Sequence, residues 1–249
     1  DGIRDQPRSR GLGDVYKRQG DCRGSEMTKR LKKTQEQVFI EKVIEWYRRW
    51  GDHDLPWRAT KDPWKILIAA IMLRKTTTKQ VMRVYPVFIK KFPSPKELSS
   101  ASESEIRKII RPLGMEHQRS KLLKNLAEAL IRKFGGSIPK KKDDLILLPG
   151  VKQYIASEVL CVAYDVPEPM LDRNMVRIIE RVFAIRSKKR RPHTDPYLWK
   201  FASSLIPKNP SLAKEFNWGI LDLGRKICRP RNPKCSECPV KTLCKRAFR

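Results

Sequence analysis

The sequence lacks any long apolar run. A membrane-spanning helix needs about 20 consecutive apolar residues, and nothing approaching this length occurs in the 249 residues, so we expect no membrane association. The N-terminal region also lacks the apolar core of a secretory signal. We therefore expect an intracellular protein, in the cytoplasm or at the nucleoid, where thiols stay reduced.

Acidic residues are scarce relative to basic ones. There are 27 Asp and Glu against 55 Lys and Arg, giving a formal net charge of +28 and a sequence pI near 10.2. Such an excess repels itself unless an anionic partner offsets it, and nucleic acid is the commonest such partner. The charge predicts nucleic-acid binding, with a merely soluble basic protein as the alternative, and it says nothing about chemistry.

Sustained two-residue alternation of apolar and polar side chains is missing, and no internal repeat is evident, so we expect an all-α fold. From Gln35 onward, apolar residues recur at spacings of three and four on one helical face. Further helices are expected, between Pro and Gly breaks, at residues 64–73, 97–110, 118–134, 144–148 and 155–163.

Residues 1–26 show no helical or strand period. They hold six basic and five acidic residues and several glycines. We expect a disordered leader or a sequence artefact here, with Met27 as the start. Cys22 lies in this segment and has no assigned role.

Four of the six cysteines are close together near the C-terminus. Cys228, Cys235, Cys238 and Cys244 form the pattern C-x6-C-x2-C-x5-C, which leaves Cys161 alone in an apolar stretch. Disulfides fit poorly with a chain that has no secretion signal. Zinc ribbons usually use two C-x2-C pairs, and only one is present. The pattern favours a [4Fe-4S] cluster, with zinc as the open alternative.

Basic residues surround these cysteines. Residues 225–249 include nine basic residues and one acidic residue. Arg229 and Arg231 lie between the first two cysteines. We expect the metal centre to hold this loop rigidly against DNA.

A Pro149-Gly150 turn joins two apolar helical stretches between Leu147 and Ala156. Backbone N–H groups at the start of the second helix would face outward and could bind a phosphate oxygen. The candidate contacts are Gly150, Val151, Lys152 and Gln153. By itself such a turn also fits an ordinary helix corner.

Asp172 follows apolar residues and precedes a new helix, in the segment Pro169–Arg177. One role for it is to cap that helix. The other is catalytic, because cleavage of an N-glycosidic bond develops positive oxocarbenium character on the sugar. A fixed carboxylate stabilises that charge and can activate water.

Together, these motifs resemble the helix-hairpin-helix DNA glycosylase superfamily, in its endonuclease III and mismatch-glycosylase branch. The resemblance covers most of the chain and also includes the segments Asp54–Arg58, Asp62–Trp64 and Met72–Thr77. It implies two helical domains flanking a cleft, and a monomer that acts on double-stranded DNA. We expect a six-helix barrel at 59–165, with the hairpin at 147–156, and an iron–sulfur cluster domain at 27–58 and 166–249. Asp172 matches the catalytic aspartate, and the four cysteines match the cluster ligands.

Position 154 bears on the type of reaction. Bifunctional members of the superfamily carry a lysine here, whose amine forms the Schiff base needed for strand cleavage. This chain has Tyr154, which cannot form that imine. We therefore predict a monofunctional glycosylase in which Tyr154 packs against the sugar or the flipped base. Lys152, where a glycine is usual, remains a possible alternative amine.

The target base depends on a departure at position 70. The resemblance to both the adenine-excising and the thymine-mismatch glycosylases implies a glutamate at this position, whereas this chain has Ala70. The segment Arg74-Lys75-Thr76-Thr77 resembles the corresponding segment of the thymine-mismatch glycosylases, which remove thymine or uracil opposite guanine. We assign Ala70 and Asn174 to the base pocket. An enlarged pocket for a modified cytosine is the alternative, and adenine excision is disfavoured.

Base extrusion leaves a gap in the duplex that side chains must fill. Arg74 and Met115 match the wedge positions of the family, and we add Lys75 as a DNA contact. The simpler interpretation is that Arg74 is an ordinary surface residue and Met115 an ordinary core residue.

The competing function is a DNA-binding protein built on a glycosylase that has lost its activity. Ala70 and Lys152 favour that alternative, whereas the intact Asp172 motif opposes it.

Overall fold

The computed structural model describes residues 33–246, and these form helices and connecting loops with no strand among them. The expectations for residues 1–26, Cys22 included, lie outside this part of the chain. Within residues 33–246 no helix has the length and apolar character needed to cross a membrane. The predicted all-α fold is confirmed.

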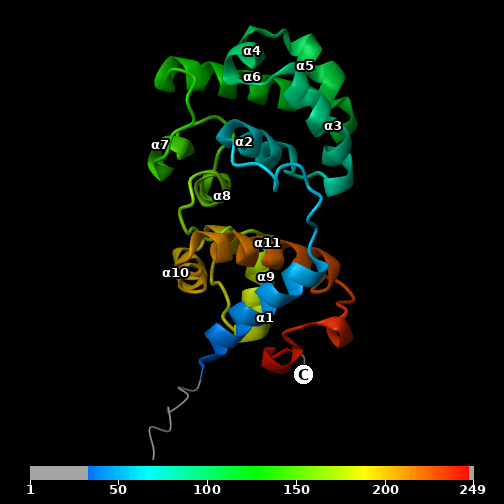
Figure 1. Cartoon of the computed structure of the whole chain (residues 1–249), viewed down its shortest axis with the longest axis vertical. Coiled ribbons are helices and arrows are strands. Elements are labelled where there is room, and N and C mark those ends of the chain that lie inside the picture. Colours follow the sequence, from blue (N-terminus) through cyan, green and yellow to red (C-terminus); the bar gives the residue numbers. More distant parts are fainter. Residues whose placement is uncertain (1–32, 247–249) are drawn as a thin grey trace, which may run out of the picture. The chain divides into compact units, whose positions relative to one another are not determined.

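One hydrophobic core is built mainly from α2 to α8. The bounds of these helices are α2 Pro63–Met72, α3 Thr78–Lys91, α4 Pro95–Ser100, α5 Glu103–Ile110, α6 Glu116–Phe134, α7 Lys142–Ile146 and α8 Gln153–Ala163. Helix α2 packs on α8, and α4 and α5 pack on α6 (Figure 1). Leu55 and Trp57 also belong to this core, although they precede the boundary expected at residue 58.

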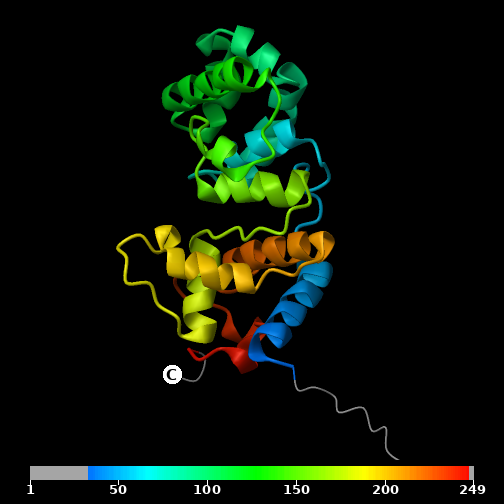
Figure 2. The same cartoon turned by 90° about the vertical axis from the view of Figure 1, so that its left-hand side faces the viewer.

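A second core joins the N-terminal helix to the C-terminal part of the chain. It contains α1 Gln35–Trp50, α9 Arg173–Phe183, α10 Pro196–Ser204 and α11 Pro210–Lys226. Helix α11 packs against both α1 and α9. The start of α1 lies beside the last described segment of the chain (Figure 2), and Gln35 Nε2 donates to the carbonyl of Leu243 at 3.0 Å.

Local sequence explains where these helices begin. Thr34 and Gln37 form a capping box at α1, and Asp62 accepts from the Trp64 N–H at 2.9 Å to cap α2. Each cap satisfies backbone donors that have no partner inside the helix. The N-termini of α1 and α2 are therefore determined by capping residues in the local sequence.

The single helix predicted at 97–110 is wrong, because two helices occur there. Helix α4 ends at Ser100, and Ser102 begins α5 with a capping box in which Ser102 and Glu105 bond each other's backbone N–H groups. A serine side chain that accepts a bond from a backbone N–H favours a new helix start over helix continuation. Apolar spacing continues across the break, which is why periodicity alone missed it.

We predict that Ser102→Ala lowers the free energy of unfolding by about 1 kcal/mol, because the α5 cap is lost. The matched change Ser99→Ala removes a hydroxyl that only bonds its own helix, through the carbonyl of Lys96. It should have a smaller effect. Chemical denaturation followed by circular dichroism compares the two, and equal losses would contradict the capping argument.

Candidate active site

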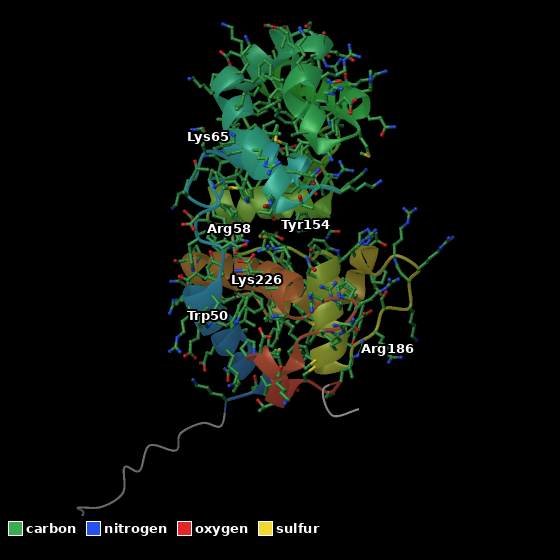
Figure 3. All side chains as sticks on the ribbon, turned by 90° about the vertical axis from the view of Figure 1, so that its right-hand side faces the viewer. Trp50, Arg58, Lys65, Tyr154, Arg186 and Lys226 are labelled. Atoms are coloured by element: carbon green, nitrogen blue, oxygen red, sulfur yellow. The ribbon has the colours of Figure 1, made fainter. Side chains whose placement is uncertain are left out.

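A cavity of about 190 Å³ lies where the two cores meet. Its walls come from the loop after α1, the end of α2, and helices α8, α9 and α11. The lining residues are Leu55, Trp57, Arg58, Leu73, Thr76, Thr78, Tyr154, Glu158, Asp172, Asn174, Trp218, Leu221, Asp222 and Arg225. Figure 3 shows Arg58 and Tyr154 at this junction.

Asp172 caps α9 and lines the cavity at the same time. Its Oδ1 accepts from the N–H groups of Asn174 and Met175, both at 2.8 Å, and its Oδ2 accepts from Asn174 Nδ2 at 2.7 Å. Burial raises the pKa of Asp172, and these hydrogen bonds oppose the rise. The two roles weighed for this residue are therefore compatible, because the cap bonds hold a carboxylate at the cavity.

Asn174, which we assigned to the base pocket, also lines this cavity. Its Oδ1 accepts from Arg177 Nη2 at 2.7 Å, and Arg177 Nε donates to the carbonyl of Cys228 at 2.7 Å. Gly224 allows this packing, because an added Cβ there would lie 2.5 Å from Asn174 Cβ. A chain of hydrogen bonds thus runs from Asp172 to the first cysteine of the C-terminal loop.

Tyr154 lies in the first turn of α8 and faces the cavity. Burial raises its pKa well above the usual value. Glu158 lies one turn later on the same helix and lines the same cavity. The Tyr154 hydroxyl lowers the pKa of its carboxyl group.

Arg58 forms a buried bidentate pair with Asp222. The Nη1–Oδ2 and Nη2–Oδ1 distances are 2.8 and 3.0 Å, and the side chains are 7% and 2% exposed. Burial works against the charge, but hydrogen bonding and attraction from Asp222 outweigh it and raise the pKa of Arg58. The guanidinium also lies 5.5 Å from the centre of the Trp218 ring, within cation–π range.

Ala70 is not brought to this cavity. It is buried in the first core, and Leu73, which follows the last residue of α2, lines the wall. The expectation that position 70 opens volume beside a bound base therefore has no counterpart in the cavity lining.

The Pro149-Gly150 turn forms a helical hairpin between α7 and α8. Gly150 has φ +78°, and an added Cβ would lie 2.9 Å from a Leu122 methyl group.

Of the other predicted hairpin contacts, Val151 is buried, whereas Lys152 and Gln153 are exposed. Lys152 stands at the start of α8, and no side chain in the described part of the chain caps this end. The first N–H groups of α8 are thus placed to hold an anion. Lys152 does not line the cavity.

Arg74, Lys75 and Met115 line a second cavity, also of about 190 Å³, next to the hairpin. Met115 is 47% exposed with φ +53°, so it is not a core methionine. Arg74 Nη1 donates to the Gly150 carbonyl at 3.1 Å. The sequence analysis did not identify Arg119, which is buried on α6. Its guanidinium donates to the carbonyls of Ile71 and Arg74, at and just after the end of α2, and to that of Gly114, just before α6. Arg119 therefore ties the turn after α2 to the turn before α6.

The four C-terminal cysteines surround a cavity of about 160 Å³. Thiolates are ligands for both zinc and iron–sulfur clusters. Buried Arg181 donates to Cys228 Sγ at 3.3 Å, which suits a thiolate ligand.

Arg181 also holds the loop between the first two cysteines. It donates to the carbonyls of Arg229 at 2.8 Å and Pro230 at 3.1 Å. Arg229 and Arg231 are exposed on this loop. Cys161 is buried apart from the four ligands, beside Asn217. One buried cation therefore connects a metal ligand with the basic loop.

Two family models match the chain. That of the HhH-GPD superfamily base excision DNA repair protein matches residues 68–204, and that of the iron-sulfur binding domain of endonuclease III matches residues 228–244. The second match coincides with the four cysteines, which therefore bind a [4Fe-4S] cluster.

Curated relatives cover most of the chain. It is 56% identical over 214 residues to the thymine-DNA glycosylase of Aeropyrum pernix, spanning 86% of this chain and 96% of that protein. It is 58% identical over 202 residues to the thymine/uracil-DNA glycosylase of Pyrobaculum aerophilum, spanning 81% and 88%.

Solved structures show the same fold. A thermostable thymine-DNA glycosylase matches with a TM-score of 0.80 at 34% identity, over 86% of this chain and 97% of that one. A non-covalent endonuclease III–DNA complex matches with a TM-score of 0.73 at 23% identity, over 87% and 97%.

We predict that protein purified without oxygen absorbs near 400 nm and carries about four iron atoms per chain, because thiolate-bound iron is coloured and zinc is not. Cys235→Ala should lose most of this absorbance. Cys161→Ser, at the buried cysteine outside the ligand set, should keep it. A colourless protein that contains zinc would contradict the assignment.

Proposed function

The chain belongs to the HhH-GPD superfamily of base excision DNA repair proteins and is a DNA glycosylase, and we propose that it hydrolyses the N-glycosidic bond of a mispaired thymine or uracil opposite guanine. The product is an abasic site in an uncut strand. The observation that carries the proposal is Asp172, a carboxylate held by three hydrogen bonds in the wall of a cavity at the junction of the two cores.

The curated relatives support the choice of base. The two named above are described as acting on thymine, or on thymine and uracil, and this chain spans 96% and 88% of their lengths. The adenine DNA glycosylase of Buchnera aphidicola subsp. Baizongia pistaciae is 33% identical, and the chain spans 58% of its length. Pyrimidine excision is the better supported reading.

In the proposed reaction, Asp172 acts on the sugar. As the glycosidic bond breaks, its negative charge stabilises the developing oxocarbenium ion, and it accepts a proton from the attacking water. The hydrogen bonds from Asn174 and Met175 fix the carboxylate before substrate arrives. This pre-organisation avoids the cost of orienting it during the reaction.

DNA would approach along the hairpin. The uncapped N–H groups at the start of α8 suit a phosphate. Exposed Met115, with Arg74 and Lys75 beside it, suits the gap left by an extruded base. The basic loop at Arg229 and Arg231 adds backbone contacts. We propose that a monomer binds double-stranded DNA in this way, inside the cell.

The enlarged-pocket alternative, a modified cytosine, depended on volume opened by Ala70. That residue is packed in the first core and does not line the cavity. No cavity feature now favours this alternative over thymine and uracil.

We predict that the protein converts T·G and U·G duplexes to products that break only after hot alkali. Asp172→Asn should lower the single-turnover rate by about 100- to 1,000-fold, because a fixed charge is lost. Asparagine caps helices as well as aspartate, so the fold should persist. Asp62→Asn, the same change at the α2 cap, is the matched control. Cleavage confined to modified cytosines, or an active Asp172→Asn, would contradict the proposal.

We also predict that the wild-type protein cuts no strand without alkali and leaves no covalent adduct with DNA under sodium borohydride, because no amine lies at position 154. Tyr154→Lys should introduce a trapped adduct. If the wild-type protein formed an adduct that Lys152→Ala abolished, the monofunctional assignment would be overturned and Lys152 would be the nucleophile.

A further inference from the structure

Glu158 is a buried acid that the mechanism above does not use. It lies in the apolar helix α8, is 6% exposed and lines the cavity that contains Asp172. Within the described part of the chain no hydrogen-bond partner reaches its Oε2 atom. A buried polar atom without a partner costs stability and is rare in folded proteins. Such an atom in a cavity wall indicates a ligand that completes it.

The groups around Glu158 come from three elements. Arg58, in the loop after α1, and Tyr154, one turn earlier on α8, both lower the pKa of its carboxyl group, whereas Asp172, at the start of α9, raises it. Burial has the largest effect and raises the pKa of Glu158 to about 7. The carboxyl is therefore protonated below neutral pH, when its unpartnered oxygen can donate.

The two acids differ in exposure and in their place on the helices. Asp172 is partly exposed at the N-terminus of α9, whereas Glu158 is buried in the middle of α8. A flipped nucleotide enters such a site base first, with its sugar still attached to the strand. Asp172 is thus placed for the sugar and Glu158 for the base.

We propose that Glu158 is a second catalytic residue, which donates a proton from Oε2 to a carbonyl oxygen of the departing pyrimidine. This proposal rests on the function proposed above. Helix α2 packs directly on α8.

The step balances as follows. The bond between the sugar C1′ and the base N1 breaks, and its electron pair moves onto the base ring. The Glu158 proton passes to a base carbonyl oxygen, so that the base leaves neutral. Water adds to C1′ and gives a proton to Asp172. Glu158 ends ionised and Asp172 protonated, and exchange with solvent resets both.

The required protonation states give the pH dependence. Glu158 must be protonated, so the rate should fall as pH rises through about 7. Asp172 must be ionised, and burial raises its pKa, so the rate should also fall at the acidic end. A bell-shaped profile follows, and its alkaline limb belongs to Glu158.

The test is the single-turnover rate on a U·G duplex from pH 5.5 to 9, for the wild-type protein, Glu158→Gln and Glu128→Gln. Glu128 is an exposed residue on α6 and is the matched control. At pH 6, Glu158→Gln should be slower on the order of 100-fold, since a general acid contributes at least this much. Its alkaline limb should disappear, so that the two rates converge at high pH, while Glu128→Gln behaves as wild type.

A second substrate separates proton donation from a structural role. 5-Fluorouracil is a better leaving group than uracil and needs less help from an acid. The loss caused by Glu158→Gln should therefore be smaller on a 5-fluorouracil·G duplex. Circular dichroism and the absorbance near 400 nm verify that the variant is folded.

The outcomes are distinct. A loss that is equal at every pH and for both bases would make Glu158 a support for Tyr154 and overturn the inference, while the proposed function stands. Unchanged rates in Glu158→Gln would do the same. A wild-type protein that cleaves no pyrimidine mismatch would overturn the proposed function and this inference with it.

Discussion

The arrangement of the active site depends on the buried ion pair between Arg58 and Asp222. It fastens the loop after α1 to α11, where the two hydrophobic cores meet. A buried pair is tolerable only if its hydrogen bonds are satisfied. Here Asp222 also accepts from the Asp52 N–H at 2.8 Å, and Arg58 donates to the Asp52 carbonyl at 3.0 Å. The pair therefore fixes the cavity wall and places a positively charged group near Glu158.

The two acids differ because their surroundings differ. Asp172 receives three hydrogen bonds, which favour its charged form, whereas Glu158 is more deeply buried and its Oε2 has no hydrogen-bond partner among the described residues. Burial alone raises both pKa values. Hydrogen bonding then separates them, so that one carboxyl suits the ionised role and the other the protonated role. Two carboxyl groups in one cavity can thus divide the work between sugar and base.

The C-terminal metal centre is tied to the same site through side chains. Arg177 connects Asn174 with the backbone at Cys228 and Gly224, and Arg181 connects Cys228 with the basic loop. Arginine suits this work because its planar group donates several bonds in fixed directions. The local sequence pattern assigned no role to Arg177 or Arg181. Their partners lie about fifty residues away in the sequence, so local patterns carry no sign of these contacts.

The sequence by itself determined the helical class, the four cysteine ligands, the hairpin and the aspartate that begins α9, because each depends on local spacing or on capping chemistry. Glu158 was visible there as a lone acid in an apolar stretch, but its meaning was not. Only the tertiary structure decided that Ala70 stays in the core and that Glu158 faces Asp172 across chain segments. The reason is physical: a cavity is formed by side chains from distant segments, and which of them face it depends on how the helices pack against one another.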